Sequence, residues 1–163
     1  MNDFTPKRFV KEHVYQLVAS REKVFPLLCP VREYEWIHGW VCDMVYSDSG
    51  IAENNCIFKT EFPHGLGEGI WVVSKYDTEN FGIGFVIVYP GMAVENLDVW
   101  LEAADNGSII HWRRTYTGLS PDGNRVLEHL TGEFLDMMMQ WTINSLNHYL
   151  AKGEMLTEMV PGS

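Results

Sequence analysis

The sequence predicts an α+β domain in which a curved antiparallel sheet of about seven strands wraps around one long C-terminal helix. Three observations predict this fold class. An alternating strand at residues 7–18 is followed by two short helices, and about six further strands come after Trp40. The chain then changes to a helical spacing of apolar residues that continues to about Leu150.

The first strand is predicted from the alternation of side chains over residues 7–18. Val10, Val14 and Val18 would lie on one side of this strand, and residues such as His13 on the other. The Val and Tyr content of the segment also favours a strand.

Two short helices are expected directly after this strand. Ser20 is a candidate N-cap for the first, REKVFPLL. Pro30 stands at the start of the second, PVREYEWI, which ends at Gly39.

The middle of the chain consists of strand-like segments separated by Gly, Asn, Asp and Pro. Asp105, Asn106 and Gly107 join the two longest, and the Asn-Gly pair favours a tight hairpin turn. The expected strands cover residues 41–50, 56–62, 69–77, 81–89, 93–104 and 108–118.

The long helix is predicted from apolar residues that recur three or four positions apart after Pro121. No internal repeat, low-complexity tract or linker marks a boundary, so residues 1–163 are expected to form a single domain. The apolar positions of the helix are Leu127, Leu130, Phe134, Met138 and Trp141.

The charge and composition exclude several classes of function. The 163 residues include 22 acidic and 12 basic side chains, for a formal net charge of −10, so a nucleic-acid partner is not expected. The longest apolar run, near residues 81–89, is too short for a bilayer, and the first residues do not resemble a signal peptide. We therefore expect a cytoplasmic protein without membrane insertion.

No cofactor or metal is expected. The six histidines are scattered, and the three cysteines lack a C-x-x-C spacing and are expected to be reduced thiols. The sequence also has no phosphate-binding loop, no dinucleotide fingerprint and no G-x-S-x-G motif.

The last two strands carry charged residues that allow two interpretations. Their pairing would place Arg113 or Arg114 beside Glu95 or Asp98. An inward pair would bind or polarise a ligand in an apolar cavity, whereas an outward pair would be a surface ion pair, which charged strand faces favour. The alternation does not decide which face points inward.

The chain resembles the START-like superfamily, also called SRPBCC, which includes birch-pollen allergens, polyketide cyclases and lipid-transfer domains. The resemblance covers nearly the whole chain and is carried by the order of elements and by two segments. These are VFPLLCPVREYEWIHGW after the first strand, and HWRRTYTGLSPDGN with the helix that follows it. It implies a helix-grip fold with an internal hydrophobic cavity, in which the segment around Trp36 and Trp40 forms one lip.

From this resemblance we expect an apolar small molecule, such as a lipid, polyketide or isoprenoid, to bind in the cavity. The alternative is an enzyme of the polyketide cyclase or dehydratase type, in which Arg114, His111, Tyr116 or Glu95 assists enolisation. A protein-interaction module and a homodimer remain open. The candidate ligand-binding residues are Trp36, Trp40, Trp71, Glu95, Trp112, Arg114, Tyr116, Phe134, Met138 and Trp141.

Overall fold

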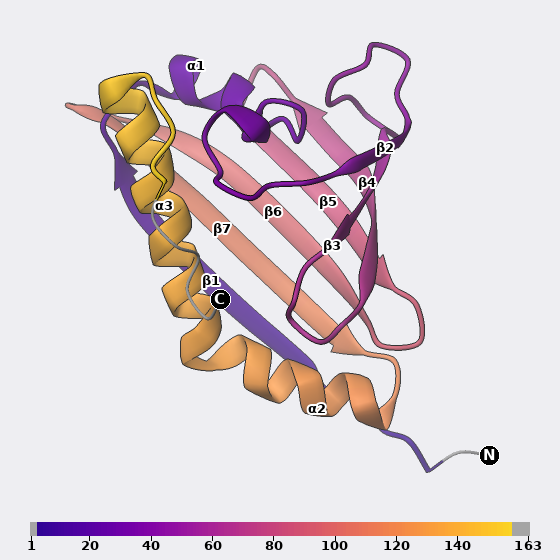
Figure 1. The fold of residues 1–163 in the computed structure, drawn as a ribbon. Helices are drawn as coiled ribbons and strands as arrows, with labels where there is room; N and C mark the ends of the chain where they lie inside the picture. Colours follow the sequence, from indigo (N-terminus) through magenta and orange to yellow (C-terminus); the bar gives the residue numbers. More distant parts are fainter. Residues whose placement is uncertain (1–2, 158–163) are drawn as a thin grey trace.

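The computed structural model describes residues 3–157, which form a curved sheet with a helix lying along one side of it (Figure 1). The strands are β1 (Arg8–Leu17), β2 (Asp43–Tyr46), β3 (Ile57–Glu61), β4 (Glu68–Asp77), β5 (Gly82–Tyr89), β6 (Ala93–Ala104) and β7 (Gly107–Gly118). The helical elements are α1 (Arg21–Val24), η1 (Phe25–Leu28), η2 (Glu33–Glu35), α2 (Pro121–His129), η3 (Leu130–Phe134) and α3 (Leu135–Lys152).

The seven strands form one sheet in the order β1-β7-β6-β5-β4-β3-β2, and every neighbouring pair is antiparallel. The first strand therefore pairs with the last, and β1 and β2 are the two edges. The helix α3 lies beside β1 and β7 in Figure 1. The segment from α1 to β2 runs across the upper part of the sheet in that view. This arrangement confirms the predicted fold class and leaves one face of the sheet turned toward the helix.

The inner face of the sheet follows the alternation seen in the sequence. In β1, Val10 and Val14 are exposed, while His13 and Leu17 are buried. The same alternation runs through β6 and β7, where every second side chain is buried. Alternation with period two thus gives one face to the interior and one to solvent.

The C-terminal helix is interrupted at one point. Ser120 caps α2 by accepting a hydrogen bond from the backbone of Gly123 at 2.9 Å, and Pro121 begins the helix. A π-helical turn, η3, then separates α2 from α3, with non-helical angles at Gly132 (φ −84°, ψ −145°). Gly153 ends α3 in the left-handed conformation (φ 73°).

The second short helix was predicted wrongly. Residues 30–37 contain only the 3₁₀ turn η2. The indole N–H of Trp36 donates to the carbonyl of Leu27 at 2.9 Å, and that of Trp40 donates to the carbonyl of Pro30 at 2.8 Å. These bonds hold the segment in a compact loop. In a regular helix the same backbone carbonyls would instead accept hydrogen bonds from backbone N–H groups four residues later.

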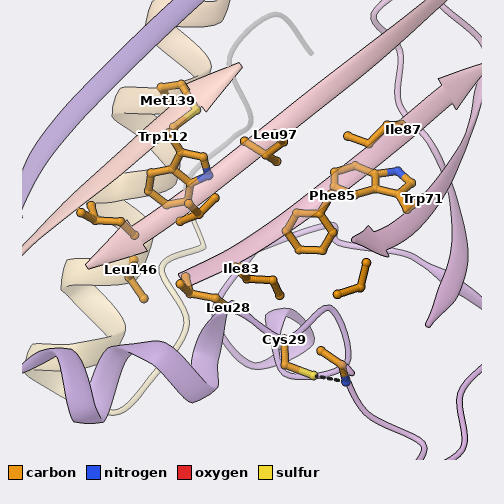
Figure 2. Close-up of a cluster of buried hydrophobic side chains, with 14 of the residues drawn as sticks. Leu28, Cys29, Trp71, Ile83, Phe85, Ile87, Leu97, Trp112, Met139 and Leu146 are labelled. Atoms are coloured by element: carbon orange, nitrogen blue, oxygen red, sulfur yellow. Dashed lines mark hydrogen bonds between the residues drawn. The ribbon is translucent and has the colours of Figure 1, made fainter. Parts of the chain in front are cut away.

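The interior between sheet and helix is filled mainly by apolar side chains (Figure 2). Trp112, Leu97 and Phe85 extend from neighbouring strands on the same side of the sheet as Met139 and Leu146 of α3. Cys29, below them in the view, accepts a hydrogen bond from the backbone N–H of Ala52 at 3.2 Å. The hydrophobic core is therefore continuous from α3 to the loop that follows η1.

The contact between α2 and the β5–β6 turn gives a test of the fold. A Cβ atom at Gly123 would lie 1.8 Å from the carbonyl oxygen of Met92, which is a backbone atom that cannot move away alone. Gly123→Ala is therefore expected to lower the free energy of unfolding by about 3 kcal/mol, despite the better helix propensity of Ala. Urea denaturation would measure this, with the exposed neighbour Asp122→Ala as control. A loss no larger than that of the control would contradict the close approach.

Candidate functional site

The most unusual feature of the apolar interior is a buried ion pair. Arg114 of β7 donates from Nη1 to Oε1 of Glu95 on β6. The Glu95 side chain is 2% exposed and that of Arg114 is 16% exposed. Tyr89 donates its hydroxyl to Oε2 of Glu95 at 3.2 Å, and Tyr116 lies directly opposite Glu95 in the sheet. We call these four residues, Arg114, Glu95, Tyr89 and Tyr116, the buried polar cluster.

The pKa values within the buried polar cluster follow from burial and from the Glu95 charge. Burial raises the pKa of Tyr89 and Tyr116, and the Glu95 carboxylate raises both further. Burial alone would lower the pKa of Arg114, but its neighbours Glu95, Tyr116 and Tyr89 together outweigh that effect and raise it. Both tyrosines are therefore neutral at neutral pH, and Arg114 is charged.

Arg114 keeps unused hydrogen-bonding capacity. Its Nη2 contacts the sulfur of Met139 on α3 at 3.7 Å, a weak acceptor. Its Nε–H is buried and has no hydrogen-bond partner among residues 3–157. A donor of this kind in an apolar interior can bind an oxygen of a ligand.

A second carboxyl group, that of Glu33 on η2, lies close enough to Arg114 to interact with its charge. Burial raises its pKa to about 8, and the positive charge of Arg114 lowers it in part. The side chain nevertheless keeps some accessible surface. This partial exposure leaves the direction of the shift, upward, unchanged. At neutral pH Glu33 is then mostly a neutral acid.

His64, in the connection between β3 and β4, adds another buried donor. Its Nδ1 accepts a hydrogen bond from the backbone N–H of Leu66 at 3.1 Å, which places the ring hydrogen on Nε2. That Nε2 is buried and unpartnered within the described part of the chain. Burial and, to a smaller extent, the charge of Arg114 lower the pKa of His64 to about 4, so the ring is neutral at neutral pH.

An apolar groove of about 350 Å³ opens beside His64. The His64 ring lies 5.2 Å from that of Tyr89, whose hydroxyl reaches Glu95. The groove wall is thus in contact, through His64 and Tyr89, with the buried polar cluster. The lining residues are Pro63, His64, Val126, His129, Leu130 and Phe134.

The two arginines of β7 lie on opposite faces of the sheet. Arg113 lies on the outer face, where its Nε is 3.3 Å from Glu12 in an exposed ion pair. The surface interpretation therefore applies to Arg113, whereas Arg114 pairs with Glu95 inside. His111 is also on the outer face, where it stacks on Trp100 and lies 3.1 Å from Glu102. The expectation that His111 could act on a ligand inside the grip is wrong.

The predicted tryptophans lie in different surroundings. Trp36 is fully buried in the core, and Trp40 is half-buried and packs on Phe62 with ring centroids 5.7 Å apart. Trp112 and Trp71 point inward, and Trp71 donates to the Thr60 hydroxyl at 2.8 Å. Trp36 is thus part of the core and is not positioned to gate a groove.

The predicted residues of the long helix divide at η3. Phe134 lines the groove. Met138, which was expected to point inward, is only half-buried. Its neighbour Met139 occupies the inward position instead. Trp141 is buried but lies outside the hydrophobic cluster that the described residues form. The backbone is non-helical at Gly132, so the chain kinks there and the spacing of apolar residues in α2 does not carry over to α3.

Four residues of this site were not predicted: Glu33, His64, Tyr89 and Met139. Tyr89 lies in a predicted strand, two residues from Ile87, which is also buried, and alternation could have found it. His64 lies in an irregular segment, for which the sequence gives no orientation, and Glu33 lies in the 3₁₀ turn η2, where a longer helix was predicted.

Within residues 3–157, no three His, Cys, Asp or Glu side chains cluster closely enough to hold a metal ion. None of the helices in this part of the chain has the length and apolar character needed to cross a membrane.

No protein-family model and no curated protein matches this chain. Solved structures do. Truncated norcoclaurine synthase from Thalictrum flavum is similar with a TM-score of 0.69 and 13% identity, over 93% of this chain and 99% of that one. Ara h 8.0201 is similar with a TM-score of 0.64 and 15% identity, over 89% of this chain and 99% of that one.

A third structure, DynU16 from the dynemicin biosynthetic locus, is similar with a TM-score of 0.60 and 14% identity. The match covers 89% of this chain and 48% of DynU16. At these identities the likeness shows the shared fold alone.

The buried ion pair can be tested through stability. Arg114→Met leaves Glu95 as an unpaired buried charge and is expected to lower the free energy of unfolding by about 3–5 kcal/mol. The double variant Arg114→Met/Glu95→Leu should lose much less, because it leaves no buried charge. Arg113→Met, in the exposed pair, should cost about 1 kcal/mol or less. Urea denaturation of the four proteins would show this, and equal losses for the two single arginine variants would contradict it.

The raised pKa of Glu33 predicts a pH-dependent stability. Between its ordinary pKa of 4.5 and the folded value of about 8, the folded chain holds a proton that the unfolded chain lacks. The contribution of Glu33 to the free energy of unfolding is therefore complete below pH 4.5. It falls by ~1.4 kcal/mol per pH unit up to about pH 8. Glu33→Gln cannot ionise and lacks this fall. The difference in unfolding free energy between variant and wild type should grow in favour of the variant from pH 5 to pH 8.

Urea denaturation at several pH values would measure this difference. The exposed Glu79→Gln is the matched control, since it removes the same charge from the surface. A difference for Glu33→Gln that stays constant over the range would show that its carboxyl is solvated like that of Glu79.

Proposed function

We propose that this chain, which has the helix-grip fold of the START-like (SRPBCC) superfamily, binds an apolar small molecule between the sheet and α3. The observation that carries the proposal is the buried polar cluster. Arg114 and Glu95 lie on the inner face among apolar side chains, and Arg114 keeps a buried N–H free within the described residues. A few fixed polar groups in an otherwise apolar surface are typical of small-molecule sites.

The groove beside His64 supports the proposal by giving a ligand a way to approach. Its walls are mostly apolar, and its volume of about 350 Å³ is within the range of small-molecule pockets. The non-helical backbone at Gly132 lies in η3, which contributes Leu130 and Phe134 to this wall. The ligand is a lipid, a polyketide or an isoprenoid-like compound in this proposal, and a similar fold, that of norcoclaurine synthase, has been solved with dopamine and hydroxybenzaldehyde bound.

The second candidate is a cyclase or dehydratase-type enzyme that acts on a ligand in the same place. The raised pKa of Glu33 favours it, because an acid that is still protonated at neutral pH can donate a proton to a ligand oxygen. Arg114 would stabilise negative charge that develops on a carbonyl oxygen. Neither group requires a cofactor for this chemistry.

Binding can be tested with Nile red, an uncharged apolar dye whose fluorescence rises on transfer from water. The wild-type protein should give a saturable titration. Val126→Trp, which enlarges a side chain in the groove wall, is expected to weaken dye binding about tenfold or more, since the groove narrows. Native mass spectrometry of the freshly purified protein would show any bound molecule in the same samples.

Met137→Trp provides the matched control, because Met137 is exposed on α3 and lies outside the groove. This variant should bind the dye as the wild type does. An unsaturable titration of the wild type would refute ligand binding, and equal affinities for the two Trp variants would refute the route through the groove.

A further inference from the structure

The charges within the buried polar cluster cancel. Arg114 is cationic, and its partner Glu95 lies beside it as the anion of the pair. Tyr89 and Tyr116 stay neutral because burial and Glu95 raise their pKa values. Among the described residues of the buried polar cluster, the positive charge is therefore already compensated before any ligand arrives.

Because Glu95 compensates the charge of Arg114, this arginine favours different ligands from an unpaired arginine. An unpaired buried arginine would bind a carboxylate, because the two charges would neutralise each other. Here a carboxylate would enter beside a neutral ion pair and would carry an uncompensated charge into an apolar interior, which costs several kcal/mol. The net charge of the chain, −10, opposes an anionic ligand as well.

The unused groups near the cluster are hydrogen-bond donors. Arg114 Nε–H and His64 Nε2–H are both buried without partners in the described part of the chain. Donors of this kind need an acceptor, and the oxygen of a ketone supplies one without a charge. Leaving such donors unpaired costs free energy, so a ligand that satisfies one of them gains affinity.

From this charge balance we infer that Glu95 makes the site selective for apolar ligands with an uncharged carbonyl oxygen, and that it excludes the corresponding carboxylates. The inference rests on the proposed ligand binding and adds the chemical class of the ligand. Glu95 is a specificity-determining residue in this view: it acts by neutralising Arg114 and need not touch the ligand.

The test compares 2-dodecanone with dodecanoate as competitors for bound Nile red at neutral pH. For the wild-type protein, the ketone should displace the dye at a concentration at least about tenfold lower than the carboxylate. In Glu95→Gln the charge of Arg114 is no longer compensated, so the preference should shift toward dodecanoate by about tenfold or more. Circular dichroism and thermal melting of the variant would establish that it is folded.

Glu102→Gln is the matched control. It removes the same charge from the same strand, but Glu102 lies on the outer face beside His111. It should keep the wild-type preference for the ketone, which separates the local effect of Glu95 from the change in net charge.

The outcomes distinguish this inference from the proposed function. If the wild-type protein binds Nile red but the carboxylate displaces it as well as the ketone does, or if neither does, the inference is wrong while apolar binding stands. The wild-type comparison alone can overturn it, even if Glu95→Gln does not fold. If Nile red itself shows no saturable binding, the proposed function fails first.

Discussion

The buried ion pair of Arg114 and Glu95 is the constraint around which the interior is arranged. A charge removed from water must be paired and hydrogen-bonded, and here neighbouring strands supply both partners. The antiparallel register of β6 and β7 sets the two residues diagonally, with Glu95 opposite Tyr116 and Arg114 opposite Leu97. A slip of either strand by one residue would turn its member of the pair to the outer face, together with the apolar residues of that strand that share the inner face. The register, the inner face and the charge pair therefore depend on one another.

The helix and the loops complete this environment. Met139 of α3 contacts the guanidinium, and α3 begins after the kink at Gly132. Glu33 and His64 come from irregular segments at different places in the chain, and both have pKa values that the charge of Arg114 lowers. The same charge thus acts on an acid and on a ring that belong to separate elements. This convergence on Arg114, more than the shape of the groove, supports the proposed site.

The sequence predicted the sheet well because its alternation is regular. The hairpin of β6 and β7, the pairing of an arginine with a carboxylate across it and the grouping of Trp112, Arg114 and Tyr116 on one face all follow from period two. It could not decide between Arg113 and Arg114, because both faces of β7 carry an arginine and both faces of β6 a carboxylate. Met138 was predicted in place of Met139 because one unbroken helical spacing was assumed across Gly132, where the backbone is not helical. Glu33 and His64 were missed because a loop residue has no periodicity from which its direction can be inferred.

The stability of the fold does not explain why a charge pair lies in this interior. Apolar residues of similar volume in place of a buried ion pair are often neutral or stabilising, because the cost of removing two charges from water offsets most of their attraction. A carrier that relied on apolar contact alone would work as well with Leu and Met at these positions. The pair contributes instead a fixed dipole, and Arg114 keeps a free N–H among the described residues in a medium where hydrogen bonds are strong. Such groups discriminate between ligands that have or lack an oxygen at the right place, so the polar part of this site is best understood as a device for selectivity.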